Sequence, residues 1–200
     1  MRNLVKARLD ADVGVGWLMR SIIADVNGDD YRHLCPSQGR SAGRRGSFAR
    51  SLMNRLNGAT AVGVLVARAG GARTRPGPRL LLLAEGYRWP FPTGGAFTVG
   101  DVVISRHRLE ELTRRYPRVL CHEERHSRQW MVLGPLFLPL YLLTMAWSWL
   151  RTGDRAAACW FEVSAGLADG GYQQVPTRRL GESLRALLRQ VDRRGSRRHR

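Results

Sequence analysis

The sequence predicts an α+β protein, compact and mostly helical, with a small β-sheet that precedes one central helix. Two short segments, residues 79–85 and 96–105, are apolar or β-branched and lie between turn-forming glycines and prolines, as strands do. Most other apolar residues recur at helical spacing. The length of 200 residues and the hydrophobic content of 44% are sufficient for one folded core.

The first 46 residues are predicted to form a weakly ordered N-terminal extension. A few apolar residues between positions 13 and 26 could line one side of a short helix. Residues 36–46 are rich in Gly, Ser and Arg, a composition typical of a flexible basic linker. The apolar patch Val13–Met19 is too short for a secretory signal, so we expect no cleaved signal peptide and a cytoplasmic protein.

The three cysteines favour the same compartment. Cys35, Cys121 and Cys159 are an odd and sparse set, from which no disulfide framework follows. A reducing compartment is therefore the simpler interpretation. We expect Cys121 and Cys159 to pack as small core residues.

Residues 47–192 are predicted to form one domain, followed by a basic tail over residues 193–200. Ser47 is a suitable N-cap for a first helix. That helix should continue through the apolar run 59–69 and stop at Gly70-Gly71.

The predicted sheet follows this helix. Residues 74–78 have the composition of a turn, and residues 79–85 that of a buried strand. Residues 89–95 should form a loop. Residues 96–105 should form either one strand with a bulge or two short strands.

Besides the apolar segment described below, four more helices are expected after the sheet. The first covers residues 108–116 and ends before Pro117. The second covers residues 118–133, and the third covers residues 156–172. The last carries a stripe of leucines over residues 180–191, with arginines on its other side.

The segment Met131–Leu150 contains twenty residues without a charge and has three interpretations. Pro135 and Pro139 interrupt its first half, which leaves Leu140–Leu150 as a helical piece too short to cross a bilayer. We predict a buried core helix. A helix that dips into a membrane interface is the alternative, and a true span ranks third.

The central helix contains the motif H-E-x-x-H, formed by His122, Glu123 and His126. Residues four apart lie on one face of a helix, so both imidazoles can reach one metal ion. Glu123 then lies beside them, where it can move a proton. Further along, Glu162 is an isolated carboxylate in apolar sequence, and its burial is costly unless a positive charge such as a metal compensates it.

These residues resemble the gluzincin branch of the zincin metallopeptidases, in particular the minigluzincin-like proteins. The resemblance covers about residues 100–172, with Gln129 extending the motif to H-E-x-x-H-x-x-Q and Glu162 opening an E-x-x-A helix. It implies a compact zincin-like fold and a zinc-dependent hydrolase acting on a peptide or protein. It also implies that His122, His126 and Glu162 bind one Zn²⁺ per chain and that Glu123 is the catalytic base.

The sequence departs from the family pattern in two places. Gly166 stands where the third ligand is usually followed by an aspartate, so we expect Asp169 to orient a ligand imidazole instead, with Gln129 as a second supporting residue. No downstream histidine is placed to stabilise an oxyanion. Tyr172 is the substitute we predict, and a purely structural tyrosine is the alternative. The strand around Val102–Ser105 would hold an extended peptide.

The net charge of +17 bears on the partners. All but one of the 33 basic residues are arginine, a skew that a coding bias toward GC-rich codons would also produce. Attraction to an anionic membrane surface is expected, and the alternative function is a catalytically degenerate zinc protein that binds such a surface through its apolar and arginine-rich helices. Nucleic acid ranks lowest, because the basic residues are scattered and lack interleaved aromatics.

Overall fold

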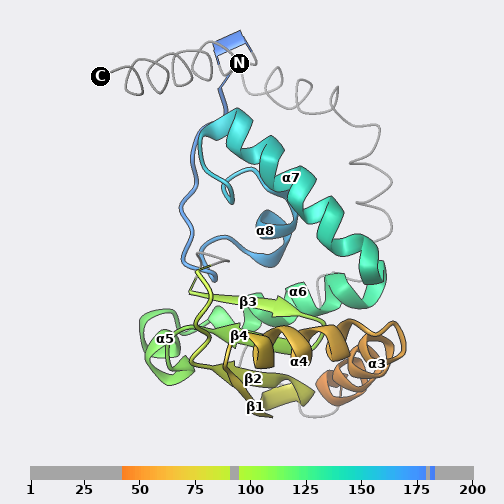
Figure 1. Cartoon of the computed structure of the whole chain (residues 1–200). Helices are drawn as coiled ribbons and strands as arrows, with labels where there is room; N and C mark the ends of the chain where they lie inside the picture. Colours follow the sequence, from red (N-terminus) through yellow and green to blue (C-terminus); the bar gives the residue numbers. More distant parts are fainter. Residues whose placement is uncertain (1–41, 91–94, 179–180, 183–200) are drawn as a thin grey trace, which may run out of the picture. The chain divides into compact units, whose positions relative to one another are not determined.

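The computed structural model describes residues 42–90, 95–178 and 181–182, drawn in colour in Figure 1. The chain divides into two compact units, Met1–Gly43 and Arg44–Arg200, and apart from residues 42 and 43 the features below belong to the second unit. The helix predicted between positions 13 and 26, most of the linker and the basic tail lie outside the described residues. So do all but two residues of the helix predicted over 180–191.

The described unit contains a four-stranded mixed sheet (Figure 1). Its strands are β1 (Arg73–Pro76), β2 (Leu82–Glu85), β3 (Ala96–Val99) and β4 (Val102–Ser105), in the order β1-β2-β4-β3. β2 runs parallel to β4, and the two outer pairs are antiparallel. The α+β class is therefore confirmed, and residues 96–105 form two short strands.

The helix predicted to begin at Ser47 is in fact two helices, α3 (Ala42–Leu56) and α4 (Ala59–Ala69). Ser47 lies buried within α3 and does not cap it. The break comes at Gly58, whose φ of 79° is left-handed, and the Asn57 side chain accepts a hydrogen bond from the Ala59 N–H at 3.0 Å. The pair Asn-Gly favours a turn, but the apolar run after it resembles a continuation of the same helix.

Residues 73–76 form an edge strand where the sequence predicts a turn. β1 pairs with β2 so that Arg73 lies opposite Glu85. Pro76 occupies the last position of this edge strand, where the absence of an N–H does not disrupt the sheet. The strand predicted over 79–85 is shorter, because Pro78–Leu80 form a 3-10 turn, η3.

The two faces of β4 pack against different helices. Val102 and Ile104 belong to a cluster that includes Ala67 of α4. Val103 points the other way, into a cluster with α5 (Leu109–Arg115) and the start of α6 (Val119–Leu133). Both of these helices agree with the predicted ones.

The last helix of the site, α8 (Trp160–Ala165), is much shorter than the helix predicted over 156–172. It ends because Gly166 adopts a positive φ of 85°. It begins late because the Asp154 carboxylate accepts hydrogen bonds from the N–H groups of Ala156 and Ala157, which forms a separate turn.

Between α6 and α8 lie a 3-10 turn, η4 (Gly134–Leu136), and α7 (Phe137–Thr152). Pro139 is in the first turn of α7, where its missing N–H breaks no helical bond, so the helix begins earlier than predicted. The prediction of a buried core helix is wrong, because only Phe137, Ser148 and Thr152 of its 16 residues are buried. By length and composition alone, the helical stretch Val119–Thr152 would be enough to cross a membrane.

The cysteines correct one further expectation. Cys121 is disulfide-bonded, although the sequence predicts no disulfide. Cys159 is free and fully buried, as expected for a small core residue. Its Sγ lies 3.3 Å from the hydroxyl of Thr144 on α7.

Candidate metal centre

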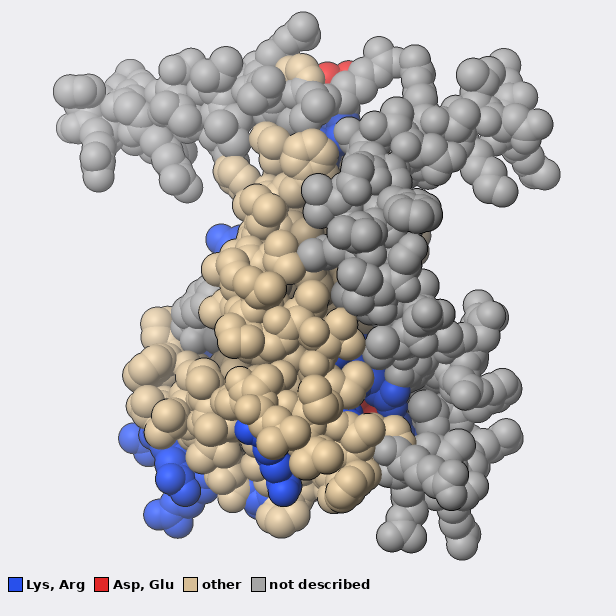
Figure 2. Space-filling view, turned by 90° about the vertical axis from the view of Figure 1, so that its right-hand side faces the viewer, with Lys and Arg blue, Asp and Glu red and all other residues tan. Residues whose placement is uncertain are grey.

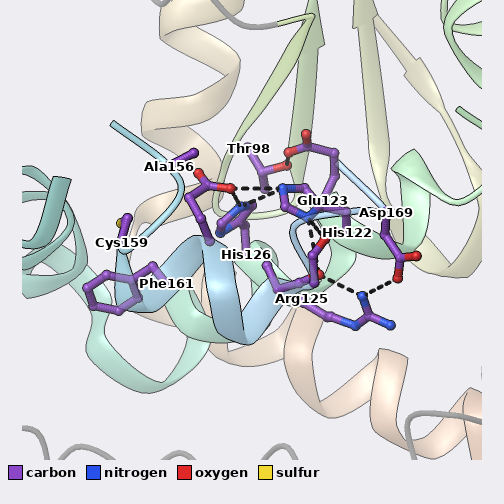
Figure 3. Close-up of polar contacts among 12 residues, drawn as sticks. Thr98, His122, Glu123, Arg125, His126, Ala156, Cys159, Phe161 and Asp169 are labelled. Atoms are coloured by element: carbon purple, nitrogen blue, oxygen red, sulfur yellow. Dashed lines mark hydrogen bonds and ion pairs between the residues drawn. The ribbon is translucent and has the colours of Figure 1, made fainter. Parts of the chain in front are cut away.

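Two helices bring three predicted ligands together. His122 and His126 lie one turn apart on α6, and Glu162 lies on α8. All three side chains are buried, and their ligand atoms lie within 4.8 Å of one another. Figure 3 shows the two imidazoles side by side, with dashed lines marking their contacts. This buried group could hold a metal ion.

Each imidazole already uses its Nδ1 atom elsewhere. His122 Nδ1 lies 3.1 Å from the backbone oxygens of both Ala165 and Gly166. His126 Nδ1 lies 2.8 Å from Gln129 Oε1. These partners are all acceptors, so both Nδ1 atoms carry the proton and both Nε2 atoms present a lone pair.

The converging atoms therefore require a positive charge between them. The two Nε2 atoms are 3.1 Å apart, and Glu162 Oε2 lies 3.2 Å from that of His122 and 3.5 Å from that of His126. Glu162 Oε2 is buried and accepts no hydrogen bond. Three acceptors so close together repel one another unless a proton or a metal ion lies among them.

The pKa values of two of these side chains also indicate that the site favours a positive charge. Burial alone would raise the pKa of the Glu162 carboxyl, but its contacts with the His122 and His126 imidazoles hold it well below the ordinary value. Burial works to lower the pKa of His126, but Glu162 and Glu123 raise it above the ordinary value. The site thus favours a cation in contact with a carboxylate.

The spacing of the three atoms fits a tetrahedral ion. Ligands about 2.0–2.1 Å from a tetrahedral centre are separated from one another by about 3.3 Å. The observed separations of 3.1, 3.2 and 3.5 Å lie around that value. Two histidines and a carboxylate are also the donor set of one class of catalytic zinc site.

Glu162 is oriented from α7. The Tyr141 hydroxyl donates a hydrogen bond to Glu162 Oε1 at 2.5 Å, which leaves Oε2 facing the imidazoles. No sequence pattern predicts a role for Tyr141. The signal that could have found it is a lone phenol within an otherwise apolar helix, since a buried Tyr hydroxyl usually has a partner.

Gln129 accepts a hydrogen bond from His126, and its own side chain is held in place. Its amide nitrogen donates to the Phe161 carbonyl at 3.1 Å and to the Ser164 hydroxyl at 2.9 Å. These bonds distinguish the two ends of the amide, so Oε1 faces His126. Gln129 therefore connects α6 to α8 and sets the orientation of one imidazole.

Asp169 does not contact an imidazole, which corrects the predicted role. Its carboxylate pairs with Arg125 at 2.7 Å and with Arg118 at 3.4 Å. Arg125 also donates to the Ala165 carbonyl at 2.6 Å, one of the two oxygens that face His122 (Figure 3). Asp169 thus acts on the backbone behind His122, and the carbonyls of Ala165 and Gly166 fill the place predicted for it.

Glu123 lies next to the ligands and lines a cavity of about 830 Å³. The Thr98 hydroxyl of β3 donates to Glu123 Oε2 at 2.7 Å, and the indole N–H of Trp130 donates to the Thr98 carbonyl at 2.9 Å. The other Glu123 oxygen, Oε1, has no such fixed donor among the described contacts. β3, not the Val102–Ser105 strand, is the outer strand at this side of the sheet, so the placement of a peptide on Val102–Ser105 is wrong.

The cavity is walled mainly by aromatic and aliphatic side chains. The ligands and Glu123 lie on its wall, and the aromatic residues around it are Tyr87, Trp89, Phe97, Trp130, Phe137, Tyr141, Trp149 and Tyr172. The Tyr172 ring lies 5.9 Å from that of His122, between centroids. Burial raises the pKa of Tyr172 above its ordinary value, so its hydroxyl is protonated and could donate into the cavity.

A second buried polar cluster holds another side of α6. Arg50 of α3 is fully buried, and its guanidinium lies 3.1 Å from Asp101 and 3.3 Å from Glu124. Other side chains complete the pairing of these two carboxylates: Asn54, Arg79, Ser127 and Arg128. The motif helix is therefore fixed to α3 and to the turn between β3 and β4.

Replacing Gln129 by leucine should weaken metal binding about 10- to 100-fold, because His126 loses the acceptor that orients its ring. The measurement is a competition titration against a coloured zinc chelator. Ser164→Ala is the matched control, since it removes one partner of Gln129 and leaves the bond to His126 intact. Equal affinity in the Gln129→Leu and wild-type proteins would contradict this role.

Comparisons with protein-family models, with curated proteins and with solved structures give no significant match for this chain.

Proposed function

We propose that this protein is a zinc-dependent, zincin-like hydrolase that cleaves peptide bonds. The observation that carries the proposal is the convergence of His122, His126 and Glu162 beside a buried glutamate, Glu123, on the wall of one cavity. A site with three protein ligands leaves a position open for water or substrate, which is the pattern of catalytic rather than structural zinc.

The donor set supports zinc as the metal. Nitrogen from two imidazoles with one carboxylate oxygen suits Zn²⁺ better than Ca²⁺ or Mg²⁺, which prefer oxygen ligands. When bound, such an ion polarises a carbonyl group and lowers the pKa of water. We propose one ion per chain.

Glu123 is the proposed general base. Its Oε2 accepts a hydrogen bond from Thr98, which holds the carboxylate in one orientation. Oε1 then takes a proton from the attacking water and passes it to the leaving amine. Tyr172 is the proposed donor to the developing oxyanion, because it lines the same cavity and keeps its proton.

The cavity favours apolar substrate residues. Its wall is mostly aromatic and aliphatic, and Thr98 and Val99 of the outer strand β3 form part of it. An extended peptide lying along β3 would place apolar side chains in the cavity and its backbone near Glu123.

Glu123→Gln tests this function most directly. Zinc content and hydrolysis of a library of fluorogenic peptides with apolar residues are measured for both proteins. We expect about one zinc per chain in each and a roughly 10²- to 10⁴-fold lower rate in Glu123→Gln, the usual contribution of a general base.

Glu111→Gln is the matched control, since Glu111 is an exposed residue of α5 outside the site. Its rate and zinc content should equal those of the wild type. Zinc binding without hydrolysis in the wild type would instead favour the catalytically degenerate zinc protein that the sequence also allows. Equal hydrolysis by Glu123→Gln would refute the assignment of the base.

A further inference from the structure

α7 has the reverse of the polarity expected for a surface helix of a soluble protein. Its hydroxyl groups face inward: Tyr141 bonds Glu162, Thr144 contacts Cys159, and Ser148 is fully buried. Its outer face, by contrast, is formed by large apolar residues. They are Leu136 of η4 and, from α7, Leu138, Leu142, Leu143, Trp147 and Trp149.

These outer residues are well exposed and carry no polar group apart from the indole N–H. Leu136 is 64% exposed and Leu143 is 67% exposed. In a water-facing helix, charged and polar residues occupy this position. Figure 2 shows a face on which the described arginines lie mainly below, and the surface above them has few charged side chains. An exposed apolar face of this extent marks an interaction site.

We propose that the outer face of α7 lies against an anionic lipid bilayer. A protein partner would be expected to meet a rim of polar residues, but the polar residues of this helix that precede Arg151 all point inward. The hydrocarbon of a bilayer does not need a polar rim around the apolar face. A helix in contact with lipid turns its polar groups toward the protein and its apolar groups toward the hydrocarbon.

The C-terminal end of α7 matches the charged surface of a bilayer. Trp147 and Trp149 lie close to this end, and tryptophan is enriched at the membrane interface. The Arg151 guanidinium lies 5.4 Å from the centre of the Trp147 ring, and Arg155 and Arg178 are exposed nearby. Together with the net charge of +17, these arginines favour anionic headgroups.

α7 would lie in the interface and would not cross the bilayer. Sixteen helical residues extend about 24 Å, which is less than the hydrocarbon thickness of about 30 Å. α6 cannot extend the span, because it buries His122, Glu124 and Arg128 against other parts of the protein. An interfacial helix needs only one apolar face.

This placement has a consequence for the substrate, which rests on the proposed function. Leu138, Leu142 and Trp149 belong to the outer face and also line the cavity. The apolar wall of the cavity is thus continuous with the surface that contacts lipid. Peptide segments that are themselves apolar and lie at the membrane are therefore the substrate class.

Vesicle flotation of the zinc-loaded full chain tests the membrane surface without any need for hydrolysis. The vesicles contain either phosphatidylcholine alone or phosphatidylcholine with phosphatidylglycerol, and the variant is Leu136→Ser/Leu143→Ser/Trp147→Ser. None of these three residues lines the cavity. We expect the wild type to bind, more strongly with phosphatidylglycerol, and the variant to bind at least roughly tenfold more weakly.

Leu80→Ser/Val163→Ser is the matched control, since both residues are exposed and apolar but lie outside α7. It should bind as the wild type does, and all three proteins should retain zinc and the same melting temperature. Equal binding by the α7 variant would overturn the proposal. So would wild-type dimers in the absence of lipid that the variant abolishes, since the face would then join two copies of this chain.

Discussion

Zinc binding should fall from about one ion per chain to a trace when His126 is replaced by alanine. The variant loses one of the three donor atoms that converge on the site. The loss should exceed the 10- to 100-fold weakening expected when only a hydrogen-bond partner behind a ligand is removed. Metal analysis after dialysis against a weak chelator gives the stoichiometry.

The same variant should lose the stabilisation that zinc gives. An ion at 100 times its dissociation constant adds about 2.7 kcal/mol to the free energy of unfolding, which raises the melting temperature by roughly 5–10 °C in a protein of this size. Calorimetry with and without zinc measures this shift. His107→Ala is the matched control, because His107 is exposed and lies outside the site. Retention of one zinc per chain by His126→Ala would contradict the assigned ligand set.

The second large effect concerns stability in the absence of metal. Replacing Arg50 by methionine should lower the free energy of unfolding by about 3–5 kcal/mol, because Asp101 and Glu124 stay buried without their shared partner. Chemical denaturation in the presence of a chelator measures the difference apart from any effect of zinc.

Arg55→Met is the matched control on the same helix. Arg55 is exposed, so its replacement should change the free energy of unfolding by less than about 1 kcal/mol. Similar stability of the Arg50→Met and Arg55→Met proteins would show that the buried cluster does not fix α6. We expect the Arg50→Met protein to unfold cooperatively, with a lower free energy of unfolding than the wild type.

The group that could hold a metal ion was predictable because its signals are local. Helical spacing alone places His122 and His126 on one face, and the cost of burying a lone carboxylate singles out Glu162. Gln129 follows from the same spacing. The bounds of α5 and α6 were also predictable, since Pro117 and Gly134 separate them from their neighbours.

The supporting contacts depend on tertiary structure and could not be predicted in this way. Tyr141 and Thr98 reach the site from elements 21 and 25 residues distant in sequence. A continuous helix would place Asp169 on the face of Glu162, but α8 ends before Gly166 and the Asp169 carboxylate pairs with Arg125. Apolar composition in α7 shows that its residues avoid water, but it does not show whether protein or lipid covers them.

The predicted ends of strands and helices are wrong where a single residue interrupts a regular apolar pattern. Gly58 divides an apolar run into two helices, and Gly166 ends α8 within an apparently continuous helix. β1 was missed because Arg73–Pro76 is polar and contains proline, a composition that an edge strand tolerates and an inner strand does not.

α7 lies within the segment of the chain that connects His126 to Glu162. The roughly 35 residues between them form a closed loop when an ion joins the two side chains, and α7 makes up nearly half of that loop. The ion then acts as a cross-link that lowers the entropy of the unfolded chain. It also holds α7 in place, although this helix buries few of its own residues. Removing the ion would open that loop at Glu162 and leave the Tyr141 hydrogen bond to restrain α7 there.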